Sequence, residues 1–258
     1  GLDAHPQILG RGTVGNSNNS YWLSDATKPL EGFPVVFGWM GHEGDQQFLR
    51  TRKTHLMIAD RLAGTDGFSD APLFDLETLK TLMYSNQVHA AEITLDDVLE
   101  ICNGFLSNDL GPIIADRNPV TDEALIDTCS VLENWDGYAN VDSVGTHVFV
   151  EFWGGIRNEL GSDFQNVVIG DEFWEINYDP ADPINTPRGI DISVEANITL
   201  VIDSLLRAYQ RLSDANVSLD AVWGDLQCLE RNEECIPIHG GSGPAGIFGA
   251  ISSGLSEG

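Results

Sequence analysis

Residues 14–22, Val-Gly-Asn-Ser-Asn-Asn-Ser-Tyr-Trp, place uncharged polar side chains directly beside two large aromatic ones. Asparagine and serine are the commonest turn formers, so a surface turn is the simplest interpretation of this stretch. The alternative is a pocket in which Tyr21 and Trp22 support amide groups that hydrogen-bond another molecule. The other segments of the chain favour the pocket.

The overall charge is strongly acidic, because the 258 residues include 40 Asp and Glu against 13 Lys and Arg, for a net charge of −27. Nucleic acids and anionic membranes bind through Lys and Arg, so this balance excludes both as partners. No run approaches the roughly 20 apolar residues of a membrane span. We expect a soluble, folded chain that forms a single region over residues 1–258, and that is a piece of a longer protein because it opens at Gly1 without a signal peptide.

The four cysteines fall into two candidate pairs. Cys228 and Cys235 flank a polar segment that can turn a hairpin, and Cys102 and Cys129 lie near the ends of two predicted helices. Two disulfides are typical of a periplasmic or secreted protein, whereas buried free thiols are the alternative. Neither pair has a further Cys-x-x-Cys motif or a histidine at ligand spacing, so we do not expect these cysteines to bind a metal.

A helical pattern begins after Gly44 and stops at Gly64. Its apolar residues recur at intervals of three and four and comprise Phe48, Leu49, Leu56, Ile58, Ala59 and Leu62. Arg52 lies on this apolar face and is therefore predicted to be buried. A buried guanidinium needs partners, because an unpaired charge in a core costs several kcal/mol. Three polar side chains of the same helix are predicted to face outward, namely Arg50, Thr54 and Arg61.

Further elements follow along the chain. Apolar spacing predicts helices at residues 76–84, 94–102, 121–132 and 192–212. Residues 144–160 contain β-branched side chains typical of a strand, but their length favours a helix. Strands are predicted within 221–229 and 235–239, where they form a hairpin, and the apolar run at 35–37 is compatible with another strand.

The segment 178–188 contains three prolines and is predicted to be a long surface loop. Its Asp179 and Asp182 are candidates for calcium binding, and solvated loop carboxylates are the alternative. Residues 241–246 match the G-x-G-x-x-G pattern of dinucleotide sites, but Pro244 lacks the N–H that a phosphate cradle needs. His239 is interpreted as a structural residue that orders a glycine loop, with a catalytic role as the alternative.

Several stretches occur in an order that is typical of a known family. They are residues 16–23 followed by 29–34, Leu49-Arg-Thr-Arg52 with 61–67, Cys129 with Trp135-Asp136, and Trp223-Gly-Asp-Leu-Gln227 with Ile236-Pro-Ile-His-Gly-Gly241. In this order they resemble the later part of the β-subunit of the penicillin acylase family, in the branch of acyl-homoserine lactone and lipopeptide acylases. The resemblance spans nearly the whole chain.

This resemblance implies an N-terminal nucleophile (Ntn) hydrolase, in which a precursor cuts itself and exposes a serine whose own α-amino group is the general base. It implies that Asn18 donates a hydrogen bond to the oxyanion, with Asn16 as the alternative, and that Arg52 lies near the catalytic site. The nucleophilic serine should open the β-subunit, whereas this chain opens with Gly1. We therefore expect the nucleophile outside the chain, with Ser17 as the alternative.

The resemblance also implies an α+β fold, in which the chain is a fragment of an Ntn-hydrolase αββα sandwich with a helical region. Its partners would be an acyl amide substrate (an acyl-homoserine lactone, a lipopeptide or a penicillin-like molecule) and the remaining acylase segments, which are the α-subunit and the N-terminal part of the β-subunit. No cofactor is implied. The competing hypotheses are a non-catalytic acidic module that binds calcium through the Asp179 loop, and a structural subunit that lacks a nucleophile.

Overall fold

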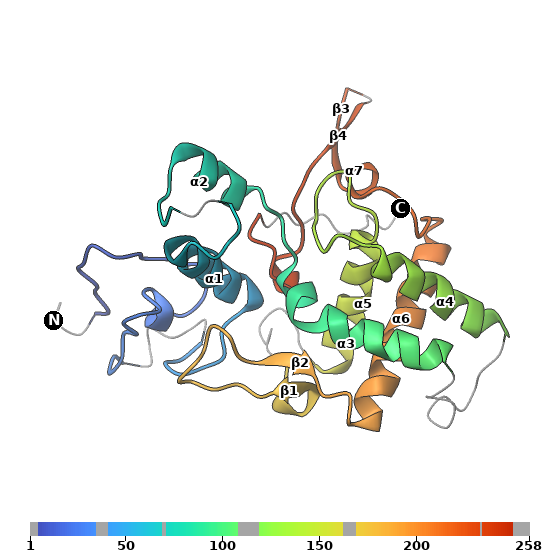
Figure 1. Ribbon diagram of the computed structural model, residues 1–258, viewed down its shortest axis with the longest axis horizontal. Helices are drawn as coiled ribbons and strands as arrows, with labels where there is room; N and C mark the ends of the chain where they lie inside the picture. Colours follow the sequence, from blue (N-terminus) through green and yellow to red (C-terminus); the bar gives the residue numbers. More distant parts are fainter. Residues whose placement is uncertain are drawn as a thin grey trace.

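The computed structural model describes residues 5–34, 41–68, 71–107, 119–161, 169–232 and 234–249, which are mainly helical (Figure 1). Among these residues, strands are confined to two antiparallel pairs. The elements observed are therefore the helical region and the hairpins of the predicted α+β fold, and the described residues contain no layered αββα sandwich. The strand suggested at 35–37 lies outside the described residues.

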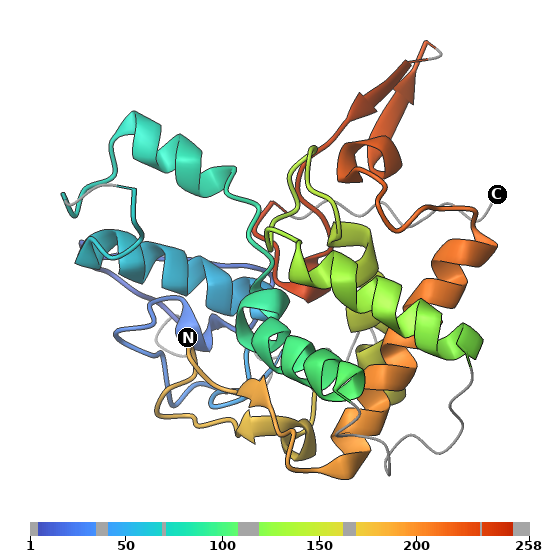
Figure 2. The same cartoon turned by 45° about the vertical axis from the view of Figure 1, so that its right-hand side comes forward.

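A group of four helices forms the main hydrophobic core (Figures 1 and 2). The helices are α3 (His89–Leu106), α4 (Pro119–Glu133), α5 (Thr146–Glu159) and α6 (Glu195–Asp214). Large side chains such as Phe149, Phe152 and Leu205 are fully buried between them. The helices predicted at 94–102, 121–132 and 192–212 are confirmed, and the ambiguous segment 144–160 is a helix because its β-branched and aromatic residues fill this core.

The two strand pairs lie outside this helical group. In the first, β1 (Trp174–Ile176) pairs with β2 (Arg188–Ile190), so that Trp174 faces Ile190 across the ladder. The proline-rich segment between them is irregular, as predicted. In the second, β3 (Cys228–Arg231) pairs with β4 (Glu234–Pro237) and forms the hairpin that projects from the body in Figure 2.

The strand predicted across 221–229 is partly wrong, because Trp223–Leu226 forms the short helix α7. Tertiary contacts override the strand pattern here. The Trp223 indole donates to the carbonyl of Gly240 at 2.9 Å, and Gly224 lies so close to Val141 that an added Cβ would be 2.7 Å from the Val141 carbonyl oxygen. A helical turn satisfies both contacts, and the hairpin begins only after it.

The helices α1 (Leu49–Ala63) and α2 (Leu76–Met83) lie beside the four-helix group (Figure 1). The predicted stop of α1 at Gly64 is confirmed, and Gly64 has the left-handed φ of +71° that favours glycine at a helix end. Asp75 and Thr78 form a capping box at the start of α2. Among the described residues, no helix has the length and hydropathy of a membrane span.

The predicted faces of α1 need correction. Arg52 is buried as predicted, but Arg61 is buried too and pairs with Asp66 at 3.0 Å, whereas the predicted core residue Leu62 is half exposed. The inward side of α1 is largely polar, because it contacts the loop at 17–19 and the polar start of α3. Of the predicted apolar residues of α1, Leu62 is exposed, whereas Leu49 packs against the hydrophobic core and Leu56 and Ile58 are partly buried.

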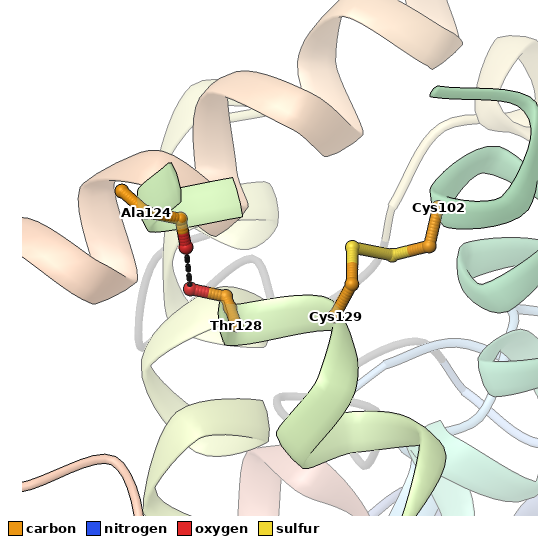
Figure 3. Close-up of a disulfide and its surroundings, with 4 residues drawn as sticks. All are labelled: Cys102, Ala124, Thr128 and Cys129. Atoms are coloured by element: carbon orange, nitrogen blue, oxygen red, sulfur yellow. Dashed lines mark hydrogen bonds between the residues drawn. A yellow bond between two sulfur atoms is a disulfide. The ribbon is translucent and has the colours of Figure 1, made fainter. Parts of the chain in front are cut away.

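Both candidate cysteine pairs form disulfides. Cys102–Cys129 joins α3 to α4 (Figure 3), next to the hydrogen bond from the Thr128 hydroxyl to the Ala124 carbonyl. Cys228–Cys235 joins the two strands of the second hairpin. The prediction of two disulfides is therefore confirmed, and none of the four cysteines has a free thiol.

The two disulfides are expected to differ in their contribution to stability. Replacing both cysteines of Cys102–Cys129 by alanine should lower the free energy of unfolding by about 3.5 kcal/mol, because the bridge spans a sequence separation of 27. The same change at Cys228–Cys235, with a separation of 7, should cost about 2.4 kcal/mol. Urea unfolding of both double variants tests the order, and an equal or reversed loss would contradict this chain-entropy argument.

Candidate functional site

The asparagine-rich loop is fastened to helix α1 by side-chain hydrogen bonds. Each of three successive loop residues contacts one α1 side chain, namely Ser17 with Thr54 (3.0 Å), Asn18 with Arg50 (2.8 Å) and Asn19 with Thr51 (3.3 Å). Ser17 and Asn19 are buried, whereas Asn18 is exposed. The loop is therefore held on both sides of Asn18, and its Asn18 side chain remains accessible.

The two aromatic residues that follow the loop, Tyr21 and Trp22, hold it in place. Trp22 is buried, and Tyr21 donates its phenol hydrogen to Glu43. Glu43 also accepts from the backbone N–H groups of Gly32 and Phe33, at 2.7 and 2.9 Å. Burial together with the Glu43 hydrogen bond raises the pKa of Tyr21 to about 12, so the phenol keeps its proton near neutral pH. The predicted support of the loop by its aromatic residues agrees with this arrangement.

The backbone and the amide of Asn18 are both fixed. Its φ of +60° is left-handed, a conformation that asparagine tolerates better than most residues, and its N–H donates to the Asn16 side-chain oxygen at 2.8 Å. The guanidinium of Arg50 has only donors, so the amide oxygen of Asn18 must face it. The NH₂ group then points away from Arg50, and no acceptor among the described residues engages it.

Arg52 lies only two residues after Arg50, yet it faces the opposite side of α1. Its guanidinium is 1% exposed, and its Nε donates to the carbonyl of Ile184 at 2.8 Å. Its Nη1 and Nη2 have no hydrogen-bond partner within the described residues. Burial lowers the pKa of Arg52 to about 10, although the charge of Asp182 opposes the shift. A buried charge with two unmet donors is costly, so this site is incomplete as described.

A second charged group lies between α1 and α3. Lys53 Nζ contacts Glu92 Oε1 at 2.5 Å and donates to the Gln87 side-chain oxygen at 2.6 Å. His89 Nδ1 lies 2.8 Å from the other Glu92 oxygen. Burial lowers the pKa of His89, so the ring is neutral near pH 7. Burial alone would raise the pKa of Glu92, but the His89 hydrogen bond and the Lys53 charge lower it to about 2.

The structure brings some predicted residues together and separates others. Asn18 and Arg52 are both positioned by α1, but they make no hydrogen bond with each other and contact different segments. Ser17, the alternative nucleophile, is buried, and its hydroxyl forms a hydrogen bond with the Thr54 hydroxyl. His239 lies 3.1 Å from the Asn86 side-chain oxygen, which is consistent with its structural interpretation.

The two candidate calcium ligands have local partners instead. Asp179 accepts from the Ala181 N–H at 2.8 Å, and Asp182 accepts from the Asn185 amide at 2.7 Å. Within the described ranges, no group of three or more His, Cys, Asp or Glu side chains is placed to hold a metal ion.

Sequence analysis missed Arg50, which was assigned to the outer face of its helix. Its spacing from Thr54 contained a usable signal, because residues four apart share one helix face and both contact the loop. The Lys53–Glu92 pair was also missed. Its partners lie 39 residues apart, and no local pattern connects them.

Comparison with known proteins gives one consistent result. The penicillin amidase family matches residues 1–249. Aculeacin-A acylase of Actinoplanes utahensis is 33% identical over 252 residues, which cover 95% of this chain and 27% of that protein. Acyl-homoserine lactone acylase PvdQ of Pseudomonas syringae pv. syringae is 28% identical over 249 residues, covering 96% of this chain and 28% of the relative. The chain thus spans little more than a quarter of the length of these relatives.

The group around Glu92 predicts a pH dependence of stability. Because the pKa of Glu92 is lowered from 4.5 to about 2, its stabilisation is complete above pH 4.5 and is lost as the pH falls toward 2. Glu92→Gln should therefore lower the free energy of unfolding at pH 7 by about 2 kcal/mol, less than the full pKa shift implies because about a third of the side chain is exposed. Denaturant unfolding of Glu92→Gln and wild type between pH 7 and pH 3 measures this difference in the free energy of unfolding.

The control is Glu77→Gln, which removes an exposed ion pair with Lys80 and should change stability little. The difference between Glu92→Gln and wild type should shrink below pH 4.5. A difference that stays constant down to pH 3 would contradict the assignment.

Proposed function

Because the chain belongs to the penicillin amidase family, we propose that it is part of an amide hydrolase and supplies the hydrogen-bond donor that stabilises the oxyanion. The observation that carries this proposal is the orientation of the Asn18 amide. The Arg50 guanidinium donates a hydrogen bond to the Asn18 amide oxygen at 2.8 Å, so the NH₂ group is the part of this side chain that remains for a ligand. The names of the relatives, aculeacin-A acylase and acyl-homoserine lactone acylase, support an acyl amide substrate.

The proposed reaction is acyl transfer to water. A serine hydroxyl attacks the amide carbonyl, and its proton passes to the α-amino group of the same residue. An α-amino group has an ordinary pKa of about 7.7–8, so it can accept this proton near neutral pH. The carbonyl oxygen becomes negatively charged in the tetrahedral intermediate, where the Asn18 NH₂ donates to it. The amine leaves with the proton, and water then hydrolyses the acyl-serine. We propose that this serine lies on a segment outside the present chain.

Arg52 has a separate proposed role. Its guanidinium is enclosed by the chain itself, and its Nε donates to the Ile184 carbonyl at 2.8 Å, which supports a role in holding the segment before β2 against α1. Arg52 would then act as a positioning residue, while Asn18 contacts the reacting atoms.

The same proposal extends to the complete protein. The chain would contribute a helical region and a hairpin to an αββα Ntn hydrolase, whose other parts are the α-subunit and the N-terminal part of the β-subunit. The matched share of 27% in aculeacin-A acylase supports the existence of such parts. The two disulfides support a periplasmic or secreted location.

Removing the Asn18 donor should abolish most of the turnover. Asn18→Ala in the full gene product is expected to lower kcat by about 10²–10³-fold, the typical value of one oxyanion donor. Asn18→Asp should be as severe although it keeps an acceptor for Arg50, because it replaces the NH₂ donor by a negatively charged oxygen. The measurement is the release of free homoserine lactone from long-chain acyl-homoserine lactones, followed by mass spectrometry.

Asn16→Ala is the matched control for these variants. Asn16 accepts the Asn18 N–H in the turn, so its removal should loosen the loop and reduce turnover far less. Unchanged turnover in Asn18→Ala would move the donor role to Asn16 or elsewhere. If the correctly processed wild type hydrolyses no acyl amide, the acylase proposal itself is wrong.

Arg52→Met should lower kcat while the variant still folds. One lost charge-assisted hydrogen bond is worth about 1.5–3 kcal/mol, which corresponds to roughly 10–150-fold in rate. Arg52→Lys should restore little, because an ammonium cannot reproduce the geometry in which the guanidinium Nε donates to the Ile184 carbonyl. Single-turnover kinetics and a thermal melt test this, with exposed Arg231→Met as the control. Wild-type rates in Arg52→Met would exclude the positioning role.

A further inference from the structure

Helix α1 and its neighbours leave an unusually apolar surface uncovered. Seven large apolar side chains from the end of α1 to the end of α2 are 41–67% exposed, namely Leu62, Phe68, Leu73, Phe74, Leu76, Leu79 and Met83. We call this set the α1–α2 apolar surface. Large exposed apolar patches are uncommon on monomeric soluble proteins and mark interaction sites, and Leu79 and Met83 of this set line one cleft.

On α2 and near the end of α1, apolar side chains that normally face a core are exposed to solvent. On α2, Leu76, Leu79 and Met83 share one stripe, yet only Leu82 at the edge of that stripe is buried. On α1 the buried side contains Met57 besides Arg52 and Arg61, while Leu62 near the helix end is half exposed. An amphipathic helix turns its apolar stripe toward a core, so the stripe of α2 lacks the core that it would normally face.

A cleft continues the same surface between the two helices. It has a volume of about 330 Å³ and is lined mainly by apolar side chains, including Met57 and Ile58 of α1 and Phe74 before α2. Figures 1 and 2 show α2 above α1 and set apart from the four-helix group. The cleft can therefore receive apolar side chains from a partner that packs against both helices.

We propose that the α1–α2 apolar surface is the face on which the remaining segments of the acylase pack. This inference rests on the proposed function, because it takes the chain to work as one part of a longer hydrolase. The relatives extend far beyond the matched region, which covers 27% of aculeacin-A acylase and 28% of PvdQ. A second copy of this chain fits less well, since each copy has a net charge of −27 and the two would repel.

The test uses the full acylase and carbene footprinting, which labels exposed side chains of every type. Residues 71–84 should be labelled about five-fold less per residue than the hairpin 228–237, because interface cores are packed like protein interiors. In the chain by itself both segments are exposed, and Leu229 of the hairpin is 54% exposed. Labelling of 71–84 at the level of the hairpin would overturn the proposal.

Two further outcomes would also overturn it. Protection of 71–84 that disappears on dilution would identify a second copy as the occupant, and protection that appears only after a long-chain fatty acid is added would identify a ligand. The matched variants are Leu79→Glu and Leu229→Glu, which place a charge at side chains that are 43% and 54% exposed. Leu79→Glu should greatly reduce the yield of assembled acylase, while Leu229→Glu should leave it unchanged.

The footprint is independent of catalysis. If 71–84 is protected but no acyl amide is hydrolysed, the docking surface stands and the proposed function fails. If hydrolysis is normal but 71–84 is labelled freely, the docking surface fails and the proposed function stands.

Discussion

The inward polar face of α1 is the constraint on which the rest of the site depends. Thr51 and Thr54 hold the asparagine-rich loop, Lys53 reaches Glu92 on α3, and Arg52 reaches the loop before β2. The apolar residues of α1 are divided accordingly, because Met57 is buried and Leu49 packs against the core, whereas Leu62 is half exposed. The loop geometry around Asn18 and the exposure of Leu62 are both consistent with one choice of helix orientation.

Arg50 and Arg52 contact different segments from opposite sides of α1. Arg50 satisfies an amide oxygen at the surface, and its own charge remains partly in water, so the contact orients Asn18 at little cost in desolvation. Arg52 is buried with one hydrogen bond, and its lowered pKa reflects that cost. Its two Nη atoms have no hydrogen-bond partner among the described residues, so the cost of burying this charge is only partly offset there.

Local patterns predicted the elements better than their surroundings. The end of α1 at Gly64, the long helix α6, the hairpin and both cysteine pairs follow from spacing and from residues adjacent in sequence. Arg61 was misplaced because its partner Asp66 lies beyond the helix end, and α7 was missed because Trp223 is held by the distant Gly240. The stretch at 14–22 is held by a residue that no local pattern connects to it, because Arg50 lies 32 residues after Asn18.

The failure on α1 has a more general physical cause. A periodic pattern identifies which side of a helix is apolar, and a core is then assumed on that side. That assumption holds only when the chain contains its own core partners. Here the pattern of Leu56, Ile58 and Leu62 predicts one buried apolar side, but Leu56 and Ile58 are only partly buried and Leu62 is half exposed among the described residues. An apolar side that the described residues cover only in part is expected where further residues pack against it.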